Sequence, residues 1–471
     1  MEWKTRQGCT KNISFYHMHL VLMLLISIWL IYVMSYHASV YPFYQKIING
    51  RRFDTDQKPR NEPIINFYLY PLEYFPSFWG KNSTCDHSKV LSNKHDSYIY
   101  AIQAMKRHPW RTSVPNEAMI AFLPISLDVF ASGGCPGLQL GTILQELKGV
   151  IQNSTIFPNI RHVFIAQDWR TWAGFMNNGI ARKISLVLKP AGIVAAMEGR
   201  GDCKTSLPYS TNYASFMSMR DPNSWHIPNP APFGSSRIYS VNMVGTFVAR
   251  QKFSERVALF KSNGTLPNSF IVTTLDLNKD EIIALMQKDQ RLRFCHHHND
   301  TDRCISQDKY PSRLETQAIM EKSNYTLALR GDTYGSDRWS QAMVAGNALI
   351  QVVDGEKAWD WLPFPCSVPW RDIVLTIPKD KYMSCPATSV KELIYSVKDE
   401  TQHRLQQSSL YYATDIDWTS YNSRVLENFL RESYYVPCRD FERSIGAPSS
   451  PELLTQEWCT PRKLNFHRKI G

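Results

Sequence analysis

Residues 326–364 read TLALRGDTYGSDRWSQAMVAGNALIQVVDGEKAWDWLPF and predict a strand, a glycine-containing loop, a helix and a second strand. The apolar run TLAL ends before the loop, Ser336 is a suitable N-cap for the helix, and Gly346 is a suitable residue to end it. The next apolar run ends at Asp354. This order of elements directs backbone N–H groups and the positive end of a helix to one point, which suits a diphosphate.

The residues expected to hold a diphosphate are Arg330, Gly331, Gly335, Ser336 and Arg338. Arg330 precedes the loop and Arg338 lies in the first turn of the helix, and both can bond phosphate oxygens bidentately. The alternative is an ordinary capped helix whose arginines form salt bridges. Two glycines and two arginines within a strand–helix–strand context favour nucleotide binding.

Apolar runs alternate with helical segments on both sides of a proline-rich linker at 227–233, which predicts an α/β fold in two halves. Before the linker, we expect a helix at 140–150 and strands at 64–70, 118–123, 162–166, 184–188 and 193–196. After it, we expect helices at 251–262, 279–287 and 338–345 and strands at 241–247, 269–274, 326–329 and 348–353. From Asp399 to Phe429 the chain is expected to be helical. Parallel strands of this kind place ligands at their carboxyl ends.

An apolar stretch near the N-terminus predicts a transmembrane signal-anchor at 15–36. Lys4, Arg6 and Lys11 precede it, so the short tail is expected to stay cytosolic. A signal peptide cleaved near Ala38 is the competing interpretation. The long apolar core favours the uncleaved anchor, and therefore a single-pass type II protein whose large part is lumenal.

Sequons and cysteines fit a lumenal location. N-x-S/T acceptors occur at Asn82, Asn153, Asn263, Asn299 and Asn324. Of 10 cysteines, only Cys9 precedes the anchor, and the others can form disulfides in an oxidising lumen. Cys295–Cys304 is the first candidate pair, and Cys366–Cys385 and Cys438–Cys459 are weaker candidates.

The composition excludes some classes of protein. The 471 residues are 43% hydrophobic and 20% charged, which excludes a mostly disordered chain. A net charge of +11 favours anionic partners such as nucleotides, acidic glycans, anionic lipid or nucleic acid. A lumenal location excludes nucleic acid as a partner.

Several of these residues resemble a known family. Arg330-Gly331, Gly335-Ser336, Arg338, Ala342 and Leu362-Pro363-Phe364 are similar to the carboxyl-terminal signature of exostosin-type glycosyltransferases, family 47, and HVFIAQDW at 162–169 more faintly resembles a strand ending in His-Asp-Trp-Gly. The resemblance spans roughly 64–377 and is dense only at 325–364. It implies a GT-B architecture: two Rossmann-like domains facing across a cleft, preceded here by a single transmembrane helix. It also implies a nucleotide-sugar donor, usually UDP-linked, held by the second domain, and inversion at the anomeric carbon.

The chain departs from the family pattern at a few positions. Gln341 stands where the family usually has a carboxylate that contacts the donor, so we assign Gln341 to donor binding, with hydrogen bonding kept and charge lost. Gln167 stands in place of a common His, Arg170 in place of Gly, and Leu329 in place of Pro. These changes permit an altered donor or acceptor. They also leave open a non-catalytic lumenal protein that binds glycan or assists a partner transferase.

An inverting transfer needs a base for the acceptor hydroxyl and positive charge for the leaving diphosphate. Arg330, Ser336 and Arg338 are expected to stabilise the diphosphate. Asp168, at a predicted strand end, is the candidate base, although an N-cap or a partner for Arg170 is an equally good interpretation. His226 is a weaker candidate for the same role.

No catalytic metal or other cofactor is expected. The histidines at 296–298 lie between Cys295 and Cys304 without the spacing of a zinc finger, so we interpret this stretch as a disulfide loop. The D-x-D pattern at 300–302 overlaps the Asn299 sequon, and the GT-B layout places the donor phosphate elsewhere.

The predicted organisation is a cytosolic tail (1–14), the anchor (15–36), a stem (37–62), an N-terminal Rossmann-like acceptor domain (63–235), a C-terminal Rossmann-like nucleotide-sugar domain (236–400) and a helical extension (401–471). The expected protein is a Golgi hexosyl- or pentosyltransferase that moves a sugar from a UDP-sugar to a glycan or glycoprotein. A homo- or hetero-oligomer with another glycosyltransferase is possible. A lumenal sulfotransferase ranks low, because 64–71 holds no glycine-lysine loop.

Overall fold

The computed structural model describes residues 62–87, 97–153, 160–167, 180–188, 192–196, 203–208, 237–247, 254–261, 269–275, 313–330, 337–418 and 423–436, with Thr171, Leu266 and Cys438. The chain divides into two units, Met1–Glu62 and Pro63–Gly471. The predicted anchor at 15–36 and the linker at 227–233 lie outside the described residues. Among the helices within the described ranges, none has the length and apolar character needed to cross a bilayer.

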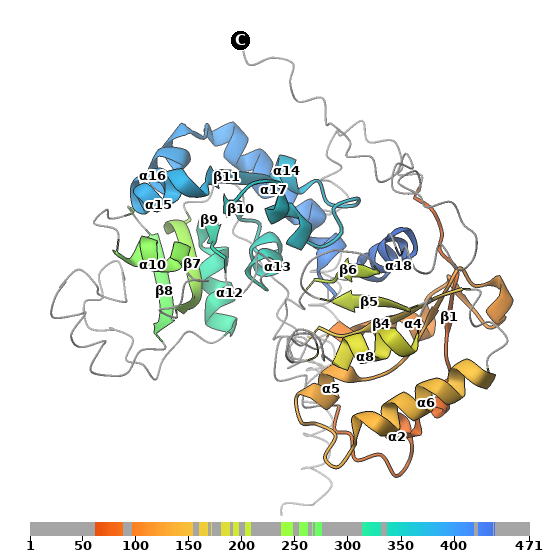
Figure 1. The fold of residues 1–471 in the computed structure, drawn as a ribbon. Coiled ribbons are helices and arrows are strands. Elements are labelled where there is room, and N and C mark those ends of the chain that lie inside the picture. Colours follow the sequence, from red (N-terminus) through yellow and green to blue (C-terminus); the bar gives the residue numbers. More distant parts are fainter. Residues whose placement is uncertain are drawn as a thin grey trace, which may run out of the picture. The chain divides into compact units, whose positions relative to one another are not determined.

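The first half of the larger unit is built on a parallel six-stranded sheet with the order β2-β1-β3-β4-β5-β6 (Figure 1). Its strands are β1 (Phe67–Leu69), β2 (Arg111–Thr112), β3 (Ile120–Phe122), β4 (Arg161–Ile165), β5 (Gly192–Ala196) and β6 (Lys204–Ser206). The strands predicted within 64–70, 118–123, 162–166 and 193–196 are confirmed. The short β2 and β6 carry no apolar run that could have predicted them.

Both faces of this first sheet are covered, because successive side chains of a strand point to opposite faces. On β3 and β4, Ile120, Phe122 and Val163 belong to one buried cluster, and their neighbours Ala121 and Phe164 belong to another. Strands that are buried on both sides read as continuous apolar runs. This is why they could be recognised in the sequence.

In the described part of the first half, the helices are η1 (Leu72–Tyr74), α2 (Pro76–Trp79), α4 (Ser97–Arg107), η2 (Pro115–Glu117), α5 (Leu127–Ala131), α6 (Leu140–Asn153) and α8 (Ile180–Val187). The strand predicted at 184–188 is wrong, because residues 184–187 belong to α8. Ile184 is buried, whereas Lys183 and Leu186 are exposed, which is the one-sided burial of a helix packed on a sheet. A short apolar run does not by itself distinguish the two structures.

The second half is built on a parallel five-stranded sheet with the order β11-β10-β9-β7-β8. Its strands are β7 (Tyr239–Phe247), β8 (Ser269–Leu275), β9 (Ser323–Ala328), β10 (Ala348–Val353) and β11 (Val374–Pro378). Its helices are α10 (Ser254–Lys261), α12 (Arg313–Glu321), α13 (Asp337–Val344), η4 (Glu356–Trp361), α14 (Trp370–Ile373), α15 (Lys379–Ser384) and α16 (Pro386–Ser396). The four strands predicted for this half are confirmed, and the helix predicted at 279–287 lies outside the described residues.

Gly346 ends α13 as the sequence predicted. Its φ of 68° is in the left-handed region that glycine adopts without a steric cost. The Gly346 N–H donates to the Met343 carbonyl, and the Asn347 N–H donates to the Ala342 carbonyl, which is the Schellman arrangement. The helix therefore stops one turn before β10.

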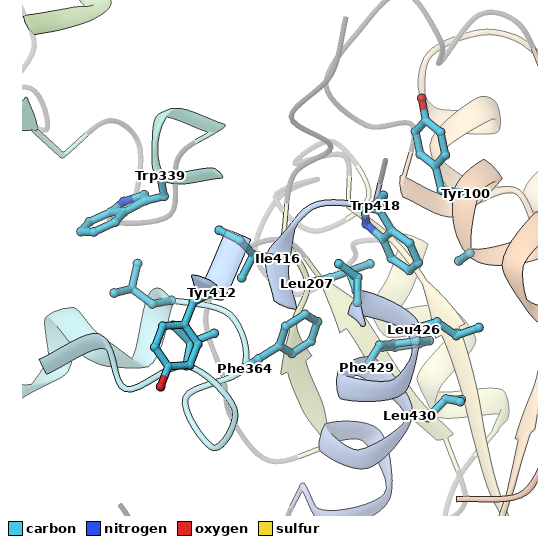
Figure 2. Packing of buried hydrophobic residues seen from close by; sticks show 14 of the residues in the cluster. Tyr100, Leu207, Trp339, Phe364, Tyr412, Ile416, Trp418, Leu426, Phe429 and Leu430 are labelled. Atoms are coloured by element: carbon cyan, nitrogen blue, oxygen red, sulfur yellow. The ribbon is translucent and has the colours of Figure 1, made fainter. Parts of the chain in front are cut away.

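The region after Asp399 forms two helices, α17 (Asp399–Ile416) and α18 (Val425–Tyr435), instead of one continuous stretch. Helix α17 contacts α13 and β10, whereas α18 contacts β3, β6 and α4. Figure 2 shows the buried side chains that this packing brings together, including Tyr412 and Ile416 of α17 and Leu426 and Phe429 of α18, with Phe364 between them. The two carboxyl-terminal helices thus share one apolar cluster with both sheets.

The disulfides differ from the predicted pairs. Cys85 is bonded to Cys135 and Cys203 to Cys438. The predicted Cys438–Cys459 pair is therefore wrong. The predicted Cys366–Cys385 pair is also wrong, because Cys385 is a free, exposed thiol while Cys366 is in a disulfide. Cys295 and Cys304 lie outside the described residues, so their pairing stays a prediction.

Candidate functional site

The carboxyl edge of the second sheet gathers several basic side chains. Arg330 follows the end of β9 by two residues, and Arg338 lies in the first turn of α13. Gly331, Gly335 and Ser336, predicted between them, lie outside the described residues. The structure thus brings both predicted arginines to this edge, where parallel sheets bind their ligands.

Arg338 is turned towards the end of β7. Its Nε donates to the carbonyl oxygen of Val244 at 2.8 Å, and its Nη1 donates to Oε1 of Gln341. Gln341 is only 3% exposed. Gln341 therefore acts here as a buried acceptor that orients the guanidinium.

Arg256 is a functional candidate that the sequence did not single out. It lies in α10, is 8% exposed, and its Nη2 donates to the carbonyl oxygen of Leu329 at 3.2 Å. Its guanidinium also lies against Gly245, where an added Cβ would be 3.2 Å from Cζ and Nη1. A basic residue in a predicted helix usually indicates a solvated face. Only the pairing of β7 beside β9 places Arg256 at the site.

Carboxylates at the same edge are paired with Lys379. The Lys379 Nζ lies 3.4 Å from Oε1 of Glu255, which is 1% exposed, and 3.1 Å from Oδ2 of Asp354. A buried carboxylate needs such a partner. Among the described side chains of this edge, the arginines therefore give an excess of positive charge.

The candidate residues of the first half are largely outside the described residues, including Asp168 and His226. Gln167, at the carboxyl end of β4, is 1% exposed and donates from Nε2 to the carbonyl oxygen of Pro208 at 3.2 Å. Ser97 Oγ donates to the same carbonyl at 3.1 Å. Gln167 thus ties the end of β4 to the segment after β6.

Within the described ranges, no group of His, Cys, Asp and Glu side chains is arranged to hold a metal ion. The histidines at 296–298 and the D-x-D pattern at 300–302 lie outside those ranges. That catalysis needs no metal stays a prediction.

Replacing Gly245 by alanine is expected to displace the Arg256 guanidinium, because the new methyl group would lie 3.2 Å from it. We expect a loss of about 1 kcal/mol in the free energy of unfolding, as for a modest overpacking, together with weaker binding of any anion at this edge. Denaturant titration and anion binding by calorimetry measure the two effects. Unchanged stability and binding would show that the contact is loose.

No family model and no curated protein sequence matches the chain. Among solved structures, it is similar to Anabaena Alr3699/HepE in complex with UDP and glucose, with 11% identity over 78% of this chain and 99% of that one, at a TM-score of 0.37. It is similar to an O-GlcNAc transferase variant of Thermobaculum terrenum, with 10% identity over 83% and 70% of the two chains, at a TM-score of 0.41. For α,α-trehalose 6-phosphate synthase from Burkholderia multivorans the identity is 9% over 76% and 81%, at a TM-score of 0.33. All three TM-scores lie below 0.5.

Proposed function

We propose that the chain is an inverting glycosyltransferase that binds the diphosphate of a UDP-sugar at the carboxyl edge of its second sheet. The observation that carries this proposal is the gathering of Arg338 and Arg256 around the end of β7, with Arg330 after the neighbouring β9. Two parallel α/β sheets in one chain are also the plan of GT-B enzymes, in which the second domain holds the donor. The exostosin-type family, the UDP moiety and the predicted domain boundaries are parts of this proposal.

The proposed chemistry is a single displacement. The acceptor hydroxyl oxygen forms a bond to the anomeric carbon while the bond from that carbon to the diphosphate oxygen breaks, and the diphosphate leaves with the bonding electrons. Arg330 and Arg338, with Ser336, stabilise the charge that develops on the diphosphate. A base takes the hydroxyl proton, and Asp168 is the proposed base, with His226 as the second candidate.

The proposed location is the Golgi lumen, with the segment 15–36 as the membrane anchor. Disulfides persist in oxidising compartments and are rare in the cytosol. The bonds Cys85–Cys135 and Cys203–Cys438 therefore support a lumenal location. The proposed acceptor is a glycan or a glycoprotein.

The test is a UDP-binding titration and a donor screen on the purified chain and its Arg338→Ala variant. Loss of a charged hydrogen-bonding partner is worth about 1.5–3 kcal/mol, so we expect about a 10- to 100-fold weaker affinity for UDP. Arg107→Ala is the matched control, since Arg107 is an exposed arginine at the end of α4 and should leave affinity unchanged.

The Arg338 side chain also bonds Val244 and Gln341, so a second variant keeps the test independent of folding. Arg338→Lys retains the charge and loses bidentate geometry, and we expect an intermediate affinity. Equal UDP affinity for the wild-type and Arg338→Ala proteins would overturn the phosphate site. UDP binding without sugar transfer to any acceptor would favour the non-catalytic alternative.

A further inference from the structure

A cavity of about 580 Å³ lies on the first half of the chain, and none of Arg256, Arg330 and Arg338 lines it. It is bounded by β1 and η1 on one side and by α6 on the other, and its lining includes Tyr68, Tyr74, Glu73 and Glu146. Figure 1 labels β1 and α6. The volume is within the range of about 300–1,000 Å³ that is typical of ligand pockets. We call this cavity the tyrosine pocket.

Aromatic rings form one side of the tyrosine pocket and are held in place from behind. Tyr74 is 49% exposed and Tyr68 is half-buried, while Tyr70 is buried. The Tyr70 ring lies edge-on to Tyr68 at 5.2 Å and tilted to Tyr74 at 6.3 Å between ring centroids. Its hydroxyl lies 2.8 Å from Nε2 of His162. The Tyr68 and Tyr74 rings thus pack against the buried, hydrogen-bonded Tyr70 ring.

The opposite side is formed by helix α6, which is bonded to Ser77 and has an open surface. Glu146 of α6 accepts hydrogen bonds from the Ser77 backbone N–H at 2.8 Å and from Ser77 Oγ at 2.6 Å. One turn further on, a Cβ added at Gly149 would meet no atom within 4 Å apart from the adjoining backbone of its own helix. The space above this part of α6 is therefore open to a ligand.

The lining indicates the chemistry of the occupant. No lysine or arginine is among the lining residues within the described ranges, and Glu73 and Glu146 are acidic. Arg111 of β2 acts electrostatically on the Tyr68 hydroxyl but does not line the cavity. The lining itself is therefore acidic and disfavours an anionic ligand, in contrast to the +11 charge of the whole chain. Tyrosine faces pack on apolar faces, and carboxylates accept hydrogen bonds from hydroxyl or amide groups. This combination suits a neutral sugar with N-acetyl groups.

A sequon asparagine stands at the rim of the tyrosine pocket. Asn153 is the last residue of α6, is exposed, and lines the cavity. Asn82 is also exposed but does not line it. Asn324 is half-buried in β9, and its Oδ1 lies 3.4 Å from Gln406 Nε2, so its side chain faces protein. Asn153 is therefore the described sequon from which an attached sugar reaches the pocket.

We propose that Asn153 carries an N-linked glycan whose first N-acetylhexosamine units lie in the tyrosine pocket, against Tyr68 and Tyr74. The inference rests on the lumenal location in the proposed function. In the modification, Nδ2 of Asn153 forms a bond to the anomeric carbon of a lipid-diphosphate-linked oligosaccharide. The lipid diphosphate leaves with the electrons of the broken C–O bond, and the amide loses one proton. The glycan then covers tyrosine surface that would otherwise face water.

The test is a double-mutant cycle on the full chain expressed in a secretory host, with glycan occupancy measured by mass spectrometry and stability by thermal unfolding. The cycle combines Asn153→Gln with Tyr74→Ala, since Tyr74 is half exposed and its truncation leaves the core intact. Asn82→Gln is the matched control, because it removes an exposed sequon that does not line the tyrosine pocket.

We expect an occupied Asn153 and a fall in Tm of about 2 °C for Asn153→Gln, because the Tm shift for a given loss of stability decreases as a domain grows. Tyr74→Ala should lower Tm similarly in the glycosylated protein and hardly at all in the Asn153→Gln background. Asn82→Gln should leave Tm unchanged.

Several outcomes overturn the inference. If Asn153 carries no glycan while Asn82 does, this inference is contradicted and the proposed function is unaffected. If no sequon of the chain carries a glycan, the lumenal location is contradicted as well. Additive effects of the two substitutions show that the glycan does not contact the ring. If Tyr74→Ala weakens acceptor binding in the Asn153→Gln background, the pocket belongs to a glycan of another molecule.

Discussion

Replacement of Arg161 by methionine is expected to lower the free energy of unfolding by about 3–5 kcal/mol. Arg161 begins β4 and is 6% exposed, and its Nη1 donates to the carbonyl oxygens of Tyr434 at 2.5 Å and Val436 at 2.6 Å. These carbonyls belong to the end of α18, where helix carbonyls lack partners and the helix dipole attracts a cation. Methionine fills similar space and leaves the buried Val436 carbonyl and the partly buried Tyr434 carbonyl without the guanidinium donor.

Urea denaturation of the two proteins measures this loss. Arg161→Lys is the matched variant, and it should recover part of the stability because it keeps the charge but has no planar guanidinium. A difference below about 1 kcal/mol between wild type and Arg161→Met would show that water satisfies the carbonyls. Because α18 packs on β3 and β6, the variant should also expose the first sheet to proteolysis.

Much of the α/β fold could be predicted because its signals are local. Strands β3, β4 and β10 are buried on both faces and therefore appear as apolar runs. Gly346 could be recognised as a helix stop because a left-handed residue after a helical pattern is usually glycine. Arg338 could be placed near the start of a helix because Ser336, a suitable N-cap residue, shortly precedes it.

The interactions that could not be predicted join residues far apart in the chain. Cys203 and Cys438 are separated by 235 positions, whereas the predicted pairs joined cysteines that are close in the sequence. Arg161 and the end of α18 are just as remote, and nothing in RHVFI indicates a helix-capping arginine. Arg256 reaches the site only because β7 lies beside β9. Such contacts depend on the order of strands and helices in space, and local sequence patterns do not determine that order.

The second large effect is a loss of stability at acidic pH, which we expect from His162. His162 follows Arg161 on β4 and is 1% exposed, and burial lowers its pKa from 6.5 to about 4. Its Nδ1–H donates to the Ile160 carbonyl at 3.0 Å, so Nε2 accepts from the Tyr70 hydroxyl at 2.8 Å. The fold therefore holds the neutral ring. Well above pH 6.5, by about one unit or more, both folded and unfolded chains carry neutral His162, and this residue adds no pH dependence.

As the pH falls below 6.5, the unfolded chain takes up a proton at His162 before the folded chain does, so stability falls until about pH 4, where the folded protein is protonated too. The difference of about 2.5 pKa units corresponds to about 3 kcal/mol. His162→Gln keeps a donor and an acceptor but does not titrate. The free energy of unfolding of wild type, minus that of His162→Gln, should therefore decrease by about 3 kcal/mol between pH 7 and pH 4. Parallel stability curves for the two proteins would mean that the folded chain accommodates the charged ring, and that the Tyr70 contact behind the tyrosine pocket does not depend on neutral His162.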